Sequence, residues 1–453
     1  MKESPDSARA PEAVGFWQAF AYWLRLGFIS FGGPAGQIAI MHRDLVEERR
    51  WISEKRFLHA LNYCMLLPGP EAQQLATYIG WLMHRTWGGV VAGALFVLPS
   101  LVILIALSWI YLRFGNLPLV AGIFYGLKPA VTALVLHAAH RIGTRALKNH
   151  WMWAIAALAF VAIFAFDTPF PAIVVAAALI GHFGARRWPA VFALGGGHGG
   201  AKASYGAALI DDITPTPVHA RFSRGQLLRV LLIGLGLWAL AMAALVATQG
   251  WHGTLVTMAW FFTKAALLTF GGAYAVLPYV YQGAVEQHQW LTGAQMIDGL
   301  ALGETTPGPL IMVVAFVGFL GGWAKQVIGP DALFAGAALA AALVTFFTFL
   351  PSFVFILAGG PLVEATHGRL GFTAPLSAIT AAVVGVIVNL ALFFAYHVLW
   401  PEGFDGRFEA AAALIAVAAA VALFCFKVGV IPLLGACAAA GLVIQFAQQE
   451  VFP

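Results

Sequence analysis

The chain has 453 residues, of which 61% are hydrophobic and only 10% are charged, and its mean hydropathy is +0.83. A soluble domain carries about 25% charged residues, so the composition excludes a soluble globular protein and indicates a polytopic membrane protein. The net charge of +5 does not indicate nucleic-acid binding, because in a membrane chain the positions of Lys and Arg matter more than their sum.

The first apolar run follows a polar N-terminal stretch, residues 1–13, and contains Arg25, so we expect no cleavable signal peptide. The run is interrupted at 26–37, which reads LGFISFGGPAGQ, and a second interruption, Pro68-Gly69-Pro70, follows. Glycine and proline end helices, and such breaks are tolerated at membrane depth where they face protein or a watery cavity. The sequence therefore predicts broken or re-entrant helices here.

Longer apolar runs follow along the chain, each near or above the roughly 20 residues that cross a bilayer. They predict transmembrane helices at 89–112, 119–140, 227–247, 332–357, 372–398, 409–426 and 428–447. The three cysteines lie in apolar surroundings without metal-ligand spacing, and no nucleophile–base motif of a hydrolase occurs. We expect no metal, no cofactor and no enzymatic activity.

The chain repeats itself. An offset of 239 positions aligns Phe31-Gly32-Gly33 with Phe270-Gly271-Gly272, Trp51 with Trp290, and Pro68-Gly69-Pro70 with Pro307-Gly308-Pro309. After a 13-residue insertion the match resumes at Leu98-Pro99-Ser100 and Leu350-Pro351-Ser352. A colinear series of this kind predicts a tandem duplication.

The duplication divides the chain into four parts. The prediction is an N-terminal repeat at 1–185, a cytoplasmic linker at 186–226, a connecting transmembrane helix at 227–251 and a C-terminal repeat at 252–453. The run GGGHGG at 195–200 lacks the Lys-Ser/Thr ending of a phosphate loop, so we interpret it as flexible linker.

Charge indicates that the two repeats are inverted. The loop at 42–56 holds five Lys and Arg residues, whereas its counterpart at 281–295 holds none. By the positive-inside rule the two loops face opposite sides of the membrane. Re-entrant hairpins at the breaks, with four full crossings in each half, fit the charges better than single crossings. The predicted fold is an all-α polytopic membrane protein with an inverted-topology tandem repeat, a cytoplasmic N-terminus and a periplasmic C-terminus.

Two stretches resemble a known family. The run SFGGPAGQIAIMHRDLVEERRWISEKRFLHALNYCMLLPGPEAQQLATYIGW at 30–81 resembles the N-terminal signature of the chromate ion transporter family, in its long two-domain form. LTFGGAYAVLPYV and GLALGETTPGPLIMVVAFVGFLGGW at 299–323 resemble its second signature. The resemblance implies an inner-membrane exporter of chromate that gives chromate resistance by proton coupling or anion exchange, with sulfate as a competing oxyanion.

The breaks themselves are the first candidates for substrate binding. A helix that begins after a break points free N–H groups and about half a positive charge at the cavity, and four such ends can converge near the midplane. The alternative is that the glycines only allow close helix packing. The candidates are Gly32, Gly33, Pro34, Pro68, Gly69, Pro70, Gly271, Gly272, Thr305, Thr306, Pro307, Gly308 and Pro309.

Two cations occupy equivalent positions six residues before each Gly-Gly, namely Arg25 and Lys264. Because a charge at membrane depth costs about 2.5–3.5 kcal/mol on the insertion scale, we expect both to neutralise a divalent anion. The alternative is that they pair with structural carboxylates or snorkel to an interface. Lys128 aligns with Thr380 and is a weaker, asymmetric candidate.

Each half keeps one carboxylate beside its Pro-Gly-Pro break, Glu71 after the first and Glu304 before the second. Both are candidate proton carriers for coupling, although Glu71 at a helix start is also a plausible cap. Asp298 aligns with His59 and ranks lower. Secondary polar candidates are Asn62, Gln74 and Asn389. His137 and His140, beside Arg141, are interpreted as a solvated or interfacial pair.

Three hypotheses follow. The first is a secondary transporter that exports chromate, coupled to protons or to another anion. The second keeps the fold but imports sulfate or another oxyanion. The third is a passive anion channel. The expected partners are chromate, sulfate as a competitor, protons, the bilayer and a second copy of the chain in a homodimer.

Overall fold

The computed structural model describes residues 11–188, 192, 205–212, 214–366 and 373–451. Within these ranges the chain is almost entirely helical, with one isolated β-bridge between Ile52 and Ile210. The N-terminal half contains α1 (Phe16–Ile29), α2 (Gly33–His42), the π-helix η2 (Arg43–Glu48), α3 (Glu54–Cys64), α4 (Glu71–Phe114), α5 (Pro118–Ala146), α6 (His150–Phe166) and α7 (Phe170–Arg187).

The C-terminal half repeats this order after a short 3₁₀ turn, η3 (Val218–Ala220), and the helix α9 (Arg224–Gln249). It contains α10 (Thr254–Leu268), α11 (Ala273–Tyr281), the π-helix η4 (Gln282–Gln287), α12 (Gly293–Thr305), η5 (Leu310–Met312), α13 (Val313–Ala324), η6 (Pro330–Ala332), α14 (Leu333–Thr366), α15 (Thr373–Leu399), α16 (Ala410–Phe424) and α17 (Val430–Val451).

The duplication is visible in the backbone. The two π-helices η2 and η4 start at positions 43 and 282, and each is followed by a left-handed residue, Arg50 or Gln289. These pairs obey the offset of 239 that aligns the two sequences. A π-helix and a left-handed residue without glycine are both rare, so their recurrence confirms the tandem repeat.

α4 consists of two arms that fold back on each other. His84 and Arg85 leave helical conformation, so that residues 71–83 pack against residues 86–114. Gly80 and Gly88 allow this close approach, because a Cβ on Gly80 would lie 2.5 Å from the carbonyl oxygen of Gly88. In the second half the same reversal lies between α13 and α14, and the extra 13 residues of that half fall around this turn.

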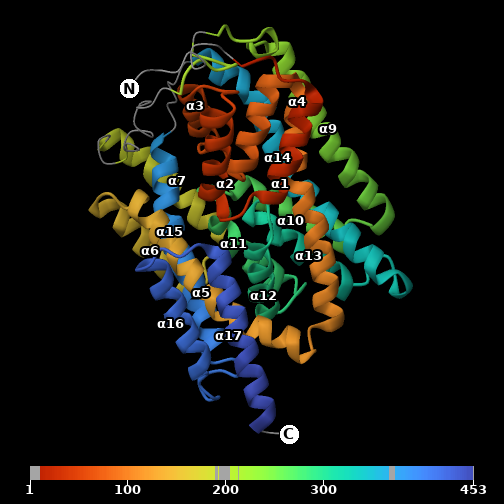
Figure 1. Ribbon diagram of the computed structural model, residues 1–453, viewed down its shortest axis with the longest axis vertical. Helices are drawn as coiled ribbons and strands as arrows, with labels where there is room; N and C mark the ends of the chain where they lie inside the picture. Colours follow the sequence, from red (N-terminus) through yellow and green to blue (C-terminus); the bar gives the residue numbers. More distant parts are fainter. Residues whose placement is uncertain (1–10, 189–191, 193–204, 213, 367–372, 452–453) are drawn as a thin grey trace.

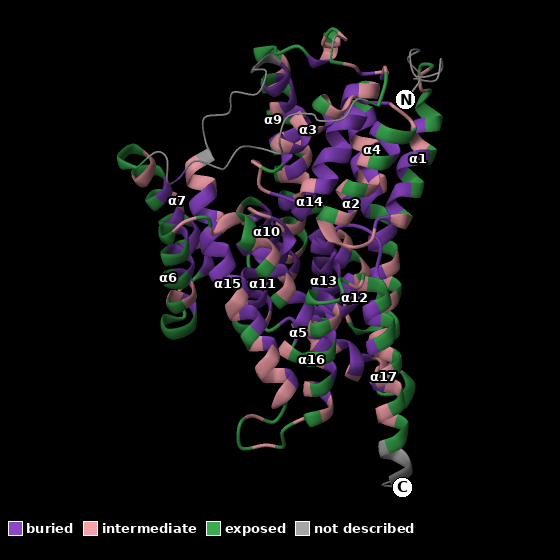
Figure 2. Cartoon of the chain, turned by 60° about the vertical axis from the view of Figure 1, so that its left-hand side comes forward, coloured by how far each residue is buried: buried purple, intermediate pink, exposed green. Residues whose placement is uncertain are grey.

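The breaks form hairpins that enter and leave on one side. In the first half, the ring of Tyr22 on α1 contacts Trp51, which precedes α3. His84, at the end of the first arm of α4, contacts the carbonyl oxygen of Val14, which precedes α1. In the second half Trp290 stacks with Phe262. In Figures 1 and 2, α2 and α3 lie toward one end of the long axis and α11 and α12 further toward the other. The repeats are therefore inverted, as the charge pattern predicts.

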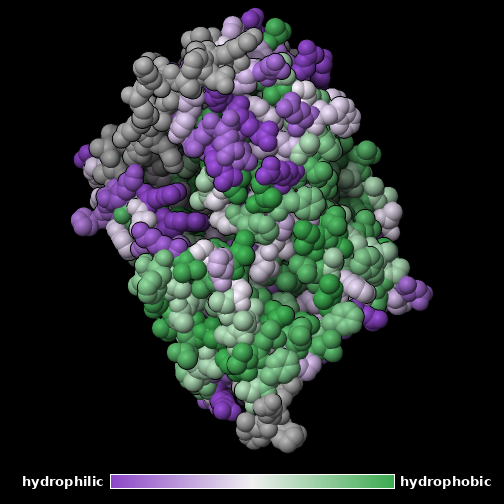
Figure 3. Space-filling view, viewed as in Figure 1, coloured by the Kyte–Doolittle hydropathy of each residue, from purple (hydrophilic) through white to green (hydrophobic). Residues whose placement is uncertain are grey.

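Membrane crossing is supported by length and composition. Among the described residues, six helices are long and apolar enough to span a bilayer: α4, α5, α9, α14, α15 and α17. Figure 2 shows exposed residues along α6 and α17, and on the face in Figure 3 hydrophobic residues dominate outside a hydrophilic end that includes the end of α3. The chain is an all-α polytopic membrane protein.

The described buried side chains form two main hydrophobic clusters. We call them the first body and the second body. The first body joins α1 to α3 and the first part of α4 with the end of α14, including Ile356 and Val363. The second body joins α10 to α13 with α5 to α7 and α15 to α17. The breaks of the two repeats therefore meet where separately packed bodies adjoin.

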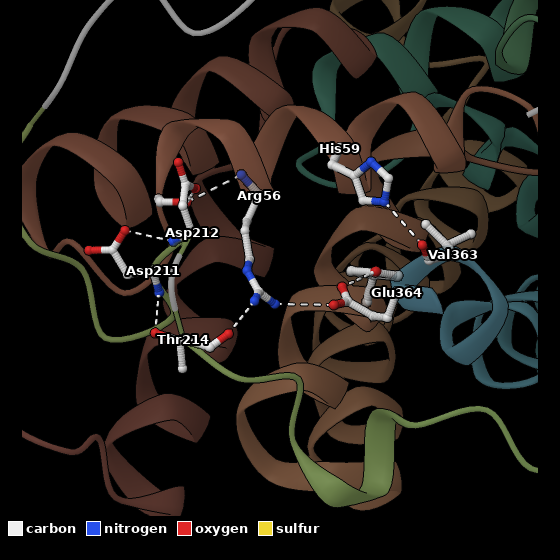
Figure 4. A network of polar contacts seen from close by, with 9 residues as sticks. Arg56, His59, Asp211, Asp212, Thr214, Val363 and Glu364 are labelled. Atoms are coloured by element: carbon white, nitrogen blue, oxygen red, sulfur yellow. Dashed lines mark hydrogen bonds and ion pairs between the residues drawn. The ribbon is translucent and has the colours of Figure 1, made fainter. Parts of the chain in front are cut away.

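The end of the linker is an ordered part of the first body. Ser53 donates its backbone N–H to Ile210 and its hydroxyl to Asp212, and Arg56 bonds both the carbonyl oxygen of Thr214 and the carboxylate of Glu364 (Figure 4). The distance from Arg56 Nη1 to Glu364 Oε2 is 3.1 Å. Residues 205–212 and 214–220 thus fasten the hairpins of the first half to the end of α14. The glycine-rich run at 195–200 lies outside the described residues.

Candidate anion-binding site

The four helix breaks meet in two reciprocal pairs. The backbone N–H of Gly69 donates to the carbonyl oxygen of Thr269 at 2.7 Å, and that of Gly308 donates to Ser30 at 2.8 Å. Positions 30 and 269 are equivalent, as are 69 and 308. A contact that is repeated with its partners exchanged is the mark of a twofold relation. Each Pro-Gly-Pro break therefore rests on the Gly-Gly break of the other repeat.

Glycine is required at these breaks by the backbone. Gly32 and Gly33 have φ values of +85° and +68°, and Gly271 and Gly272 have +80° and +98°. Side chains with a Cβ avoid this left-handed region. α2 starts at Gly33 with Pro34 in its first turn, and no side chain caps it. The N–H groups in the first turn of a helix have no partner inside it. Pro34 has no N–H, so Gly33, Ala35 and Gly36 supply the free donors at the start of α2.

A cavity of about 210 Å³ opens at the first Gly-Gly break. A water molecule takes about 30 Å³ of liquid volume, so a tetrahedral oxyanion fits. The lining comes from the first break, α5, α11, α12 and the α16–α17 turn: Gly32, Gly33, Leu134, His137, Ala138, Arg141, Tyr274, Glu304, Leu423, Val428, Gly429 and Val430. Both repeats thus contribute to one cavity between the two bodies.

The charged groups of this cavity are Arg141 and Glu304. Glu304 is 8% exposed and accepts a hydrogen bond from the hydroxyl of Tyr274. Arg141 acts electrostatically on Glu304, yet among the described residues no carboxylate forms an ion pair with its guanidinium. The guanidinium therefore has free donors on the cavity, which is what an oxyanion requires.

Arg25 and Lys264 lie elsewhere. Both side chains are exposed, on faces of α1 and α10 that also expose Phe28 and Leu267. Neither residue lines the cavity. The opposite face of α1 packs against α4, where Gly27 lies against the backbone of Leu95. The structure thus places the two symmetric cations away from the cavity, and Arg141 replaces them as our candidate.

Lys128 is engaged with a carboxylate. Its Nζ lies 3.4 Å from Oδ1 of Asp298, and Tyr111 donates a 2.8 Å hydrogen bond to the other carboxylate oxygen. Asp298 is 3% exposed, so this is a buried ion pair between α5 and α12 rather than a free cation. Lys128 does not line the cavity, and its charge is already paired with Asp298.

The remaining acidic and hydroxyl candidates either lie off the cavity or already use their hydroxyl hydrogens. Glu71 does not line the cavity, but the positive charges of Arg141 and Arg145 act on its carboxylate. Thr305 and Thr306 donate their hydroxyl hydrogens to the carbonyl oxygens of Leu302 and Gly303. A hydroxyl carries one hydrogen, so in this conformation neither threonine has a hydroxyl donor left for an anion.

The other predicted polar residues either support a helix break or lie away from the cavity. Gln74 donates to the carbonyl oxygen of Pro68 at 2.8 Å and supports the first Pro-Gly-Pro turn. Asn62 and Asn389 are half-buried and do not line the cavity. His137 lines it and is not simply interfacial, whereas His140 is exposed. Among the described residues, no three His, Cys, Asp or Glu side chains group to hold a metal ion.

Sequence reasoning missed Arg141 and Tyr274. Arg141 follows the apolar run of α5, and the sequence marks it only as the neighbour of His137 and His140, which are interpreted as a solvated or interfacial pair. Its repeat partner is Phe393, so internal symmetry offered no signal for it. The signal that was available is the face it shares with Leu134 and His137, at helical spacings of three and four residues. That face now lines the cavity.

Comparisons with known proteins agree with this architecture. The family described as Chromate transporter matches residues 17–182 and again residues 256–442. A chromate transport protein of Pseudomonas aeruginosa is 34% identical over 83% of this chain and 80% of its own. One of Cupriavidus metallidurans is 31% identical over 83% and 82%. A probable chromate transport protein of Synechococcus elongatus is 30% identical over 86% and 87%. No solved structure matches the chain.

Proposed function

This chain belongs to the chromate transporter family, and from that premise we propose that it is a secondary transporter that exports chromate across the inner membrane by a proton-coupled mechanism. Relatives named for chromate transport cover most of its length, which supports chromate as the substrate. The inverted repeat with broken helices supports secondary transport, because many such transporters place their substrate at the repeat interface.

The observation that carries the proposal is the cavity where the uncapped start of α2 faces Arg141. An oxyanion there accepts hydrogen bonds from the free N–H groups of α2 and from the guanidinium. An arginine fork matches two oxygens of a tetrahedral anion at once. The positive end of the helix dipole adds to the attraction. Chromate and sulfate share this chemistry, so we propose sulfate as a competitor.

Glu304 supplies the coupling in this proposal. Its carboxylate lines the same cavity as the anion site and is nearly buried. An ionised carboxylate repels a divalent anion strongly in a site of low dielectric constant. Anion binding therefore favours the protonated carboxyl group, and anion release favours proton loss. The proton and the anion therefore cross together, so a pH gradient can drive chromate movement. Because the pair still carries a net negative charge, the membrane potential, negative on the cytoplasmic side, favours its exit.

The orientation follows from the same charges as in the sequence. The segment 42–56, from the end of α2 to the first turn of α3, carries five Lys and Arg residues and its counterpart at 281–295 none, so we propose a cytoplasmic N-terminus and a periplasmic C-terminus. The cavity would then alternate between the two sides as the first and second bodies move against each other. Rocking of one body against another around a fixed site is the usual motion of inverted-repeat transporters.

Transport by the purified protein in sealed vesicles tests the proposal. With a pH gradient imposed, chromate should accumulate on one side above its concentration on the other, and dissipating the gradient with a protonophore should release it. Excess sulfate should slow the flux. Chromate that only equilibrates would indicate a channel, and sulfate flux without chromate flux would indicate the wrong substrate.

A further inference from the structure

The first Gly-Gly break and the second Pro-Gly-Pro break are joined by a side-chain hydrogen bond as well as by a backbone one. The N–H of Gly308 donates to the carbonyl oxygen of Ser30, and beside this bond lies Gln37 of α2. Its Nε2 lies 2.6 Å from the carbonyl oxygen of Gly308 and 3.4 Å from that of Ser30. One amide group therefore binds the two chain segments that cross there, one from each repeat.

Gln37 is buried deeply for a polar side chain. It is 1% exposed, and its Oε1 has no hydrogen-bond partner among the described residues. A buried polar atom without a partner costs about 1–3 kcal/mol. A hydrophobic side chain of similar size would avoid this cost, so stability alone does not explain an amide at this position.

The equivalent position in the second repeat lacks the amide. Position 276 is Val276, so the crossing of Gly69 and Thr269 receives no hydrogen bond from that site. Near that crossing Gln74 donates to the carbonyl oxygen of Pro68 at 2.8 Å within its own loop and, at 3.4 Å, to the hydroxyl of Ser352 on α14. Gln37 thus differs from Gln74 in that it binds backbone carbonyl oxygens of both crossing segments, and it does so at the crossing beside the charged cavity.

The bond also relates the two parts of the candidate site. Gln37 follows Gly33 by one helical turn, and Gly308 follows Glu304 by four residues. Gly33 and Glu304 both line the cavity. The Gln37–Gly308 bond consequently fixes the start of α2, which offers the N–H donors, relative to the end of α12, which carries the carboxylate.

We propose that Gln37 is a positioning residue of the anion site, whose amide N–H holds the carbonyl oxygen of Gly308 so that the start of α2 and Glu304 face the same anion. The role in binding rests on the proposed function, whereas the bond itself does not.

The test compares three substitutions at Gln37 with one matched control. Gln37→Met removes the donor at nearly constant volume, Gln37→Asn keeps an amide but withdraws it by one methylene, and Gln37→Glu keeps the shape. The control is Gln73→Met, because Gln73 is also fully buried but donates only to Thr77 on its own helix. Thermal unfolding of each purified variant reports the general cost of losing a buried amide.

The first measurement needs no anion. Hydrogen exchange of the backbone segment 303–312 should speed up at least tenfold in Gln37→Met and Gln37→Asn, since the Gly308 crossing loses its side-chain bond. The segment should exchange as in the wild type in Gln73→Met. Unchanged exchange in both Gln37 variants would overturn the proposal, whatever the protein transports. Gln37→Asn keeps a buried amide, so it covers the case in which Gln37→Met does not fold.

The second measurement is equilibrium chromate binding, expressed as the ratio of each variant to the wild type at the same pH. The ratio cancels the titration of chromate and of Glu304, which both proteins share. Gln37→Met should bind at least tenfold more weakly at every pH. Gln37→Glu should be as weak at pH 8 and recover toward the wild type at pH 5.5, because only a protonated carboxyl group can donate to Gly308.

The outcomes separate the two proposals. A wild type that binds no chromate contradicts the proposed function and leaves the exchange measurement to decide the bond. A wild type that binds chromate, with Gln37 variants that bind it equally well, overturns the positioning role alone. Equal losses in Gln37→Met and Gln73→Met, with no pH-dependent recovery in Gln37→Glu, would show a merely structural amide and also overturn it.

Discussion

The proposed anion site depends on Arg141, because among the described residues that line the cavity it alone is a lysine or arginine. Its position contrasts with that of Arg25, which lies in an apolar stretch of sequence but is exposed on α1. A guanidinium without a carboxylate partner can give its hydrogen bonds to a ligand. The two arginines therefore form a matched pair for testing the site.

Replacing Arg141 with alanine should weaken chromate binding roughly ten- to 150-fold, because a hydrogen bond to a charged group contributes about 1.5–3 kcal/mol. Arg25→Ala should change it by no more than about twofold, as exposed substitutions usually do. Equilibrium binding to the purified protein measures both. A large loss in Arg25→Ala with a small one in Arg141→Ala would return the site to the symmetric cations.

Glu304 is the residue to which we assign coupling. Glu304→Gln still accepts the hydrogen bond from Tyr274 but cannot exchange a proton. The variant should move chromate down its own gradient while losing accumulation driven by a pH gradient. Glu286→Gln, which changes an exposed carboxylate in η4, is the control. Accumulation that survives in Glu304→Gln would assign the proton to another group, with Glu71 as the next candidate.

At the scale of elements, glycines decide how closely the helical arms pack. The two arms of α4 approach each other at Gly80 and Gly88, where a Cβ on Gly80 would lie 2.6 Å from the Cβ of Ala92. Gly236, in the middle of α9, has no atom within 4 Å of such a Cβ. The same substitution therefore has opposite expected costs in the two helices.

Gly80→Ala should lower the stability of the purified protein by about 1–3 kcal/mol, the usual cost of overpacking a close contact. Gly236→Ala should leave the melting temperature unchanged or slightly higher, because alanine favours helix over glycine. Thermal unfolding in the same detergent compares them. Equal melting temperatures for both variants would contradict the close packing of the two arms of α4 at Gly80.

The breaks were predictable from sequence because they depend on backbone conformation. Left-handed φ values at Gly32 and Gly308 require glycine, so the double glycine and the Pro-Gly-Pro recur in both halves and can be found by sliding the chain against itself. The cavity charges were not predictable in this way. Arg141 aligns with Phe393 and Glu304 with Met65, so the groups with a proposed role in chemistry are those in which the two halves differ.

Repetition in both halves does not identify the cations that line the cavity, for the same physical reason. Arg25 and Lys264 are repeated because the two halves share a helix, and a shared exposed face can carry a cation whose long side chain snorkels. Repetition marks what folding of both halves requires. Which side of a helix faces a cavity depends instead on packing between distant elements, such as α1 on α4, and periodicity in one helix does not reveal it.

At the scale of the whole molecule, an inverted repeat places equivalent positions of its two halves on opposite sides of the membrane. Equivalent positions 55 and 294 lie at the starts of α3 and α12, and both side chains, Lys55 and Ala294, are exposed. The side of the membrane on which each of these two positions lies can therefore be measured without a transport assay. The orientation itself rests on the five basic residues at 42–56.

Single cysteines at these two positions should be labelled from opposite faces. In a background with the three native cysteines replaced by alanine, Lys55→Cys should react with a membrane-impermeant maleimide only in inside-out vesicles. Ala294→Cys should react only in right-side-out ones. Reaction of both from the same face would contradict the inverted arrangement, and exchanged faces would reverse only the orientation.

The position of bound chromate tests the central claim most directly. A structure determined with chromate, with the chromium located by its anomalous scattering, should show one peak in the cavity between the start of α2 and Arg141. The oxygens of the anion should lie within hydrogen-bond distance of the guanidinium. Chromium beside Arg25 or Lys264, with the cavity at Gly32 and Gly33 empty, would contradict the account.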